Sequence, residues 1–133
     1  YDICLIDNPP SINASVINAL VASDEVIIVT TPDMYGLRGV EQMITYINAI
    51  QAGYNPQLRF RGCLLNKFSM TPHGFKILAK LRKDIPLFRS RIRYTKDKPE
   101  AAAEEQQAIF EYSPNCGFSC DLVKFLRELM EGM

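Results

Sequence analysis

Short apolar runs alternate with amphipathic stretches along this chain, which is the pattern of strands alternating with helices. Apolar runs bounded by polar residues predict strands at 3–6, 26–29, 58–66 and 88–92. Between them, apolar residues recur at spacings of three and four and predict helices over 16–21, 37–53, 72–83, after Pro99, and over 118–130. Because this alternation favours parallel strands joined by crossover helices, we expect a doubly wound, mainly parallel α/β sheet flanked by helices.

The first run, Ile3–Ile6, has an acid at its end. Asp7 would then lie at the carboxyl end of a buried strand, where open α/β sheets bind ligands, and a carboxylate there suits a metal ion or a water. The following Asn8-Pro9-Pro10-Ser11 predicts a stiff, extended loop, because proline fixes φ and restricts the residue before it. The alternative is that Asp7 only caps the next turn.

Asn66 ends the third predicted strand at the same edge of the sheet. Its side-chain amide can donate and accept hydrogen bonds at once, as a ligand-binding residue at this edge would. A turn-forming asparagine before Lys67 explains the residue equally well.

The order of these and later segments resembles the ParA/MinD-type partition ATPases. The segments that carry the resemblance are Asp7–Ser11, Asn18–Leu20, Ala22–Ile28, Tyr35–Gly39, Gly62–Asn66, Ile92–Ala101 and Ile109–Pro114. Each is weak alone, but together they follow the family's order over almost the whole chain. The resemblance implies a sheet like that of P-loop NTPases and an ATPase that partitions plasmid or chromosomal DNA or positions another cargo.

The resemblance also implies roles for single residues. Asp7 would be catalytic, orienting water at the γ-phosphate of ATP or contacting Mg²⁺ directly or through water, and Pro9 would shape the nucleotide-binding loop beside it. Asn66 would read the adenine. ATP and Mg²⁺ would be the cofactors, and the partners would be a second copy in an ATP-dependent homodimer and a ParB-like stimulating protein.

The family's phosphate loop is missing from this sequence, which has no Gly-x-x-x-x-Gly-Lys-Ser/Thr motif. We therefore expect residues 1–133 to be the C-terminal portion of a single ParA-like ATPase domain. Without phosphate-loop amides and lysines, this chain alone is predicted to be inactive, and the ATPase activity would belong to the intact protein.

Composition fits one compact unit, because 133 residues with 47% hydrophobic side chains suffice for one core. No signal peptide or membrane-length apolar run is visible, which favours the cytoplasm and no membrane partner. Cys4 and Cys63 fall in predicted buried strands. Cys116 and Cys120 lack enough partner ligands for a zinc site, and free thiols are expected.

Charge is balanced overall, with fifteen basic and fifteen acidic residues, but the segment from Lys76 to Lys98 is basic. Such a cluster can bind nonspecific DNA through phosphates, and the family binds DNA through its C-terminal half. Where some relatives carry an arginine, this chain has Asp97, and a solvated basic face is the alternative. The predicted DNA-binding residues are Arg89, Arg91, Arg93, Lys96 and Lys98, and DNA binding would place the protein at the nucleoid.

Two other functions remain open. The first is a noncatalytic DNA- or partner-binding module, which the basic segment permits. The second is the related iron-sulfur reductase branch of the family. Those enzymes need a cysteine near the acid that corresponds to Asp7, and this chain has Asn8-Pro9-Pro10 there.

Overall fold

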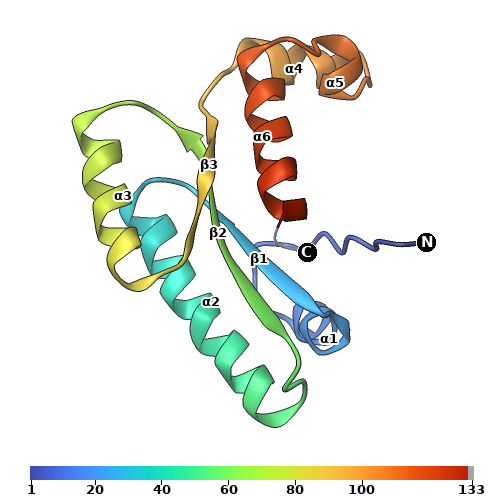
Figure 1. Ribbon diagram of the computed structural model, residues 1–133, viewed down its shortest axis with the longest axis vertical. Coiled ribbons are helices and arrows are strands. Elements are labelled where there is room, and N and C mark those ends of the chain that lie inside the picture. The colour runs from blue at the N-terminus through green and yellow to red at the C-terminus, as the bar shows by residue number, and fades with distance from the viewer. Residues whose placement is uncertain (132–133) are drawn as a thin grey trace.

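The computed structural model describes residues 1–131, with the side chains of residues 82 and 84 outside the description. Helices and strands alternate through most of the chain (Figure 1). In chain order they are α1 (Ala14–Ala22), β1 (Glu25–Thr30), α2 (Met34–Gly53), β2 (Arg59–Phe68), α3 (Pro72–Asp84), β3 (Leu87–Arg93), α4 (Asp97–Glu104), α5 (Ile109–Tyr112) and α6 (Gly117–Glu131).

The three strands form one parallel sheet in the order β1-β2-β3. Helices α2 and α3 are the crossover connections that parallel neighbours require, and both pack on the same face of the sheet. Successive strand residues point to opposite faces, so Leu87 packs with these helices while the ring of Phe88 meets Phe125 of α6. Helix α6 therefore covers part of the other face (Figure 1). The predicted parallel α/β sheet flanked by helices is confirmed.

Helix starts follow from capping side chains. The side chain of Asn13 accepts a hydrogen bond from Val16 N at 3.1 Å before α1, and Thr71 Oγ1 accepts one from Gly74 N at 3.1 Å before α3. Pro72 takes the first helical position, where its missing N–H costs nothing. The helix predicted over 72–83 thus begins where Thr71-Pro72 indicates.

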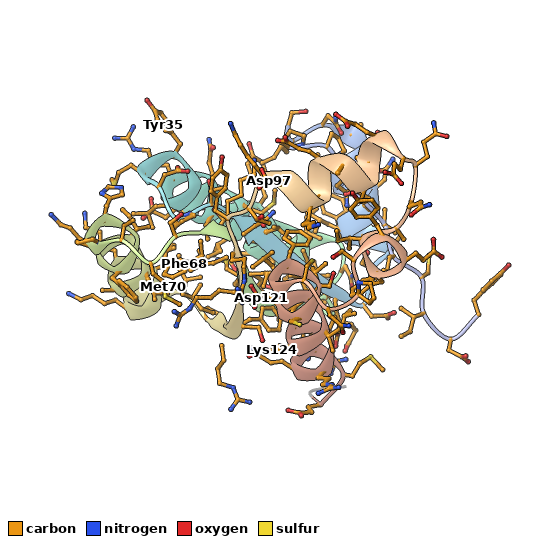
Figure 2. The ribbon with its side chains drawn as sticks, turned by 90° about the horizontal axis from the view of Figure 1, so that it is seen from above. Tyr35, Phe68, Met70, Asp97, Asp121 and Lys124 are labelled. Carbon is orange, nitrogen blue, oxygen red and sulfur yellow. The ribbon has the colours of Figure 1, made fainter. Side chains whose placement is uncertain are left out.

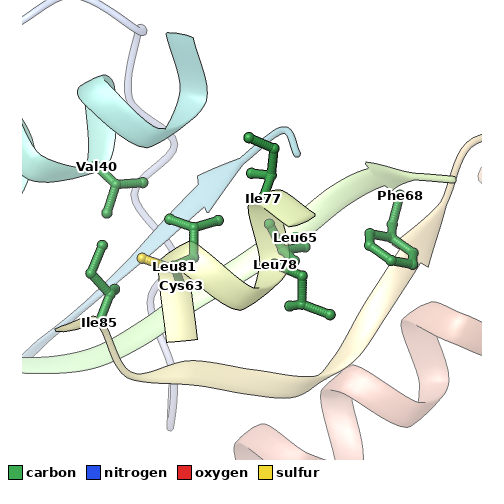
Figure 3. Packing of buried hydrophobic residues seen from close by; sticks show 8 residues of the cluster. All are labelled: Val40, Cys63, Leu65, Phe68, Ile77, Leu78, Leu81 and Ile85. Atoms are coloured by element: carbon green, nitrogen blue, oxygen red, sulfur yellow. The ribbon is translucent and has the colours of Figure 1, made fainter. Parts of the chain in front are cut away.

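Two buried clusters join the helices to the sheet. The larger connects α2 and α3 to β2, and Figure 3 shows its members: Val40, Cys63, Leu65, Phe68, Ile77, Leu78, Leu81 and Ile85. The smaller connects α1 and the end of α2 to the start of β2 through Val16, Leu20, Ile47, Ile50 and Leu58. Burial raises the pKa of Cys63 to about 12, so this thiol is a small hydrophobe, as predicted.

The strand predicted at Ile3–Ile6 does not form. Residues 1–9 have no regular secondary structure, Leu5 is 88% exposed, and the predicted burial of Cys4 is wrong. A strand needs a hydrogen-bonded neighbour and covered faces, and nothing among residues 1–131 pairs with this segment, whose end extends away from the body (Figure 1). The outer edge of β1 also carries no strand within this part of the chain, and Val29 there is 59% exposed.

The apolar spacing over 72–83 predicts that Phe75, Leu78 and Leu81 point inward, but Phe75 is 48% exposed. Its ring packs edge-on against Phe68, with the ring centroids 5.6 Å apart, while Ile77 takes a buried place. Leu78 and Leu81 are buried as predicted.

Two helices near the C-terminus differ in detail from prediction. The helix expected after Pro99 begins at Asp97, because proline is tolerated in a first helical turn. The final helix forms, and its apolar spacing predicts a core-facing stripe of Leu122, Val123, Leu126, Leu129 and Met130. Of these, Leu126 and Met130 are instead 47% and 55% exposed. Helix α6 is therefore anchored largely by polar contacts, which are described below.

Two leucines of different burial should contribute very differently to the free energy of unfolding. Leu81→Ala should lower the free energy of unfolding by about 2–5 kcal/mol, because it empties a fully buried position. Leu126→Ala, on the half-exposed face of α6, should change it by less than about 1 kcal/mol. Urea unfolding followed by circular dichroism measures both, and equal losses would contradict this description of the core.

Candidate functional site

The candidate site lies at the carboxyl ends of the parallel strands, which meet at one edge of the sheet. The ends of these strands and the residues that follow them carry Thr31, Asp33, Asn66, Lys67, Lys96 and Lys98. Figure 2 looks at the molecule from above, with Tyr35, Met70 and Asp97 labelled. Tyr35 and Met70 are 86% and 88% exposed, so large apolar side chains stand in solvent beside this edge.

Asp33 organises the turn after β1. Its carboxylate accepts a hydrogen bond from Thr31 Oγ1 at 2.5 Å and another from Gly36 N at 2.7 Å, which caps α2. The Thr31 hydroxyl first, and then the Gly36 N–H, lower the pKa of Asp33, so it stays ionised well into acid. Asp33 thus places a fixed negative charge at the helix start.

Gly36 explains why this turn is so tight. A Cβ at this position would clash with the backbone oxygen of Thr31 and lie 2.7 Å from Thr30 Oγ1. The first turn of α2 therefore presses directly on the end of β1. Sequence reasoning noted this glycine only within the Tyr35–Gly39 segment and missed Asp33, although an aspartate before an apolar-periodic stretch is a helix-cap signal.

Asn66 lies near the end of β2 and is half-buried. Its Oδ1 accepts a hydrogen bond from Lys67 N at 2.8 Å, and Lys67 has a φ of +53°. This local contact matches the turn-forming alternative and uses one acceptor position, while the nucleobase role stays a prediction.

Asp7 and Pro9 lie in the exposed segment before α1. A hydrogen bond from Asn8 Nδ2 to Ile6 O, at 3.1 Å, gives this segment one local contact. The structure does not show the strand that was expected to carry Asp7 to the carboxyl edge. The exposed carboxylate remains a hard oxygen donor of the kind Mg²⁺ prefers, and its role stays a prediction.

The predicted DNA-binding residue Arg93 is held in an ion pair with α6. Its Nε and Nη2 donate to Asp121 Oδ2 and Oδ1 at 2.7 and 2.9 Å, and its backbone N donates to Oδ2 at 3.2 Å. The Arg93 guanidinium holds the pKa of Asp121 below its usual range, and Asp121 raises that of Arg93. Half of the Arg93 side chain is exposed, so water screens the pair.

A second carboxylate of α6 binds the same strand. Glu128 accepts hydrogen bonds from Arg89 N at 2.6 Å and Ser90 N at 2.8 Å. Burial opposes its ionisation, but these N–H donors outweigh burial and lower its pKa. Arg89 itself keeps 85% of its side chain exposed, and its Nε lies 3.7 Å from Glu128 Oε1.

We call Asp121 and Glu128 with their contacts the α6 clasp. Seven helical residues span about 10 Å, close to the reach of the three to four strand residues from Ser90 to Arg93. The two carboxylates therefore match donors along β3, whose outer edge would otherwise expose unpaired N–H groups.

The remaining predicted DNA-binding residues lie in different surroundings. The Arg91 guanidinium sits 5.1 Å from the centre of the Phe68 ring, and Lys98 Nζ lies 5.9 Å from that of Tyr112. Lys96 and Lys98 are exposed beside the start of α4. The lysines after β3 are therefore exposed, whereas Arg91 and Arg93 also make contacts with other parts of the fold.

Within residues 1–131, no group of three or more histidine, cysteine, aspartate or glutamate side chains is placed to hold a metal ion. No helix of this part of the chain is long and apolar enough to cross a bilayer.

Comparison with known sequences finds partition proteins. The family model described as AAA domain (AAA_31) matches residues 1–60. The chromosome partitioning protein ParA of Myxococcus xanthus is 40% identical over 68 residues, which are 51% of this chain and 24% of that protein. The ParA family protein of Chlamydia trachomatis is 29% identical over 133 residues, which are 98% of this chain and 51% of that protein. The chain therefore spans between about a quarter and about half of the length of these curated relatives.

Comparison with solved structures finds related ATP-binding folds. The cell division ATPase MinD of Pyrococcus furiosus superposes with a TM-score of 0.78 at 18% identity, covering 100% of this chain and 53% of that one, which shows the fold. Cobyrinic acid a,c-diamide synthase of Mycobacterium smegmatis, solved with bound ADP and magnesium, gives a TM-score of 0.60 at 31% identity, covering 73% and 41% of the two chains.

The α6 clasp predicts acid-sensitive stability. The folded pKa of Asp121 lies below its unfolded value, so its contribution is present above about pH 4 and is lost as pH falls through the folded pKa. Asp121→Asn should cost about 1–3 kcal/mol of unfolding free energy at pH 7 and should flatten the loss of stability below pH 4. Urea unfolding across pH measures this.

The matched control is Asp97→Asn, which removes one exposed acid near the end of β3. It should leave the loss of unfolding free energy below about pH 4 unchanged. An Asp121→Asn variant with the full acid dependence of the parent would refute the assignment.

Proposed function

Because this chain belongs to the ParA/Soj/MinD-type family of partition ATPases, we propose that the whole protein binds ATP with Mg²⁺, hydrolyses it, and uses the cycle to position DNA or another cargo. The observation that carries the proposal is the match of sequence segments and fold together. The segments that resemble the family occur in its order, and two of them, Tyr35–Gly39 and Gly62–Asn66, belong to strands and helices that meet at one sheet edge.

The nucleotide proposal has support from a structural neighbour. The cobyrinic acid a,c-diamide synthase, at 31% identity, was solved with ADP and magnesium bound. We infer that the carboxyl edge of this sheet takes part in binding an adenine nucleotide.

The residues of this chain fit part of what a binding site for ATP and Mg²⁺ requires. The exposed Asp7 carboxylate suits Mg²⁺, directly or through a bound water, and Asn66 has the donor and acceptor groups that adenine requires. Bound Mg²⁺ would supply positive charge to the phosphates. The described residues hold no glycine-rich loop with lysine for a triphosphate, so we propose that another part of the whole protein provides it.

The exposed apolar side chains beside the edge support a homodimer. Tyr35 and Met70 are almost fully exposed, and a second copy docked at this edge would bury them. We propose that a second copy covers them when ATP is bound. A ParB-like partner that stimulates hydrolysis would act on this assembly.

DNA contact is proposed through the lysines that follow β3. Lys96 and Lys98 are exposed, and within residues 1–131 neither forms an ion pair with a carboxylate. Arg89 adds an exposed guanidinium, whereas Arg93 would first have to leave Asp121. Nonspecific contact with DNA phosphates would place the protein on the nucleoid.

The first test concerns Asp7 in the whole protein. If its carboxylate orients water or magnesium at the γ-phosphate, Asp7→Asn should lower kcat for ATP hydrolysis by at least about 100-fold with the nucleotide affinity largely kept. Steady-state phosphate release and nucleotide binding measure the two effects. Asp2→Asn, which removes another exposed acid of the same segment, is the control and should leave kcat unchanged. A parental kcat in Asp7→Asn, or no hydrolysis by the whole protein, would refute the proposal.

The second test concerns DNA. The double variant Lys96→Ala/Lys98→Ala should weaken binding to nonspecific duplex DNA and lower the slope of log affinity against log salt by roughly 2, one for each lost phosphate contact. Lys76→Ala/Lys83→Ala removes two charges from α3 and should leave the slope unchanged. Fluorescence anisotropy over a salt series measures this, and an unchanged slope in the first variant would exclude these lysines.

A further inference from the structure

A groove runs between α2 and α3, on the sheet face opposite α6. Its walls are Leu37, Glu41 and Ile44 of α2 and Lys80, Lys83 and Ile85 at the end of α3, and its volume is about 420 Å³. We call it the α2–α3 groove. It exists because the two helices touch over only a short stretch, although both pack on β2 (Figure 1).

The groove is amphipathic along its length. Leu37, Glu41 and Ile44 recur at i, i+4 and i+7 and share one face of α2, and Lys76, Lys80 and Lys83 repeat the same spacing on α3. Each stripe covers two helical turns, or about 10 Å. Leu37 and Ile44 pack partly on the core but stay half-buried, so they form an apolar floor beside a row of lysines.

Charge and shape together select the occupant. We propose that the α2–α3 groove binds an acidic amphipathic helix of a partner protein, with apolar side chains on the half-buried Leu37 and Ile44 and carboxylates at Lys80 and Lys83. Helices that bind in grooves use such apolar anchors at i, i+3, i+4 and i+7. The lysine row gives the complementary charge and sets the direction from which the partner's acids approach.

Other occupants fit this groove less well. DNA phosphates would gain nothing from the apolar floor, which an amphipathic helix would cover. A second copy placing its own groove here would bring one lysine row against another. The proposal does not rest on ATP hydrolysis and would stand if Asp7 had no catalytic role.

The experiment uses three synthetic helical peptides of about 14 residues, roughly four turns. The first has leucine at i, i+3, i+4 and i+7 with flanking glutamates, the second has lysine for every glutamate, and the third is the first with its order scrambled. Each is labelled with a fluorophore and titrated with the whole protein by anisotropy. We expect saturable binding of the acidic amphipathic peptide only.

Charge reversal then locates the site. Lys80→Glu/Lys83→Glu should weaken the acidic peptide at least about tenfold and should gain binding of the lysine peptide. Lys124→Glu/Arg127→Glu makes the same net change on exposed positions of α6 and should leave both affinities unchanged. Thermal unfolding by circular dichroism confirms that all variants are folded.

Four results would overturn the proposal. They are no binding of the acidic peptide at about 1 mM, equal binding of the scrambled peptide, equal loss in the α6 variant, and dissociation of a preexisting dimer by Lys80→Glu/Lys83→Glu in sedimentation. The last would show that a second copy occupies the groove.

Discussion

The parallel direction of the three strands is the constraint on which the rest of this structure depends. It follows from the crossover helices α2 and α3, whose apolar stripes bury against one face of β2. Since all three strands end at one edge, polar residues far apart in sequence gather there, including Asp33 after β1 and Asn66 in β2. The tight packing of Gly36 on Thr30 and Thr31 fixes the start of α2 at that edge.

The α6 clasp pairs part of the positive charge in the basic segment from Lys76 to Lys98 with carboxylates of α6. By sequence alone the arginines of β3 form one cationic run, but Asp121 and Glu128 reach them from 28 and 38 or more residues away. Part of the positive charge is thereby paired at the edge of the sheet, while Arg89, the lysines after β3 and the row on α3 stay exposed. The protein thus presents two basic surfaces of different character, one polar and one beside an apolar groove.

Patterns with local causes were predictable. The apolar stripe of α2, the Thr71-Pro72 helix start and the buried Cys63 each follow from spacing or capping within a few residues. Ile3–Ile6 failed because its strand needs a neighbouring strand that residues 1–131 do not provide. The Arg93–Asp121 pair could not be predicted because no local signal joins residues so far apart in sequence. The burial of Phe75 was predicted wrongly because helical spacing alone does not determine which of several apolar side chains on a helix is buried.

The central claim is that Asp7 faces bound nucleotide at the carboxyl edge of the completed sheet. The most direct measurement is a crystal structure of the whole protein with Mg²⁺ and a nonhydrolysable ATP analogue. The account predicts an Asp7 carboxylate oxygen within about 3 Å of a magnesium-bound water or of the water in line with the γ-phosphate. A nucleotide bound at another edge, or an Asp7 side chain pointing into solvent away from the phosphates, would contradict it.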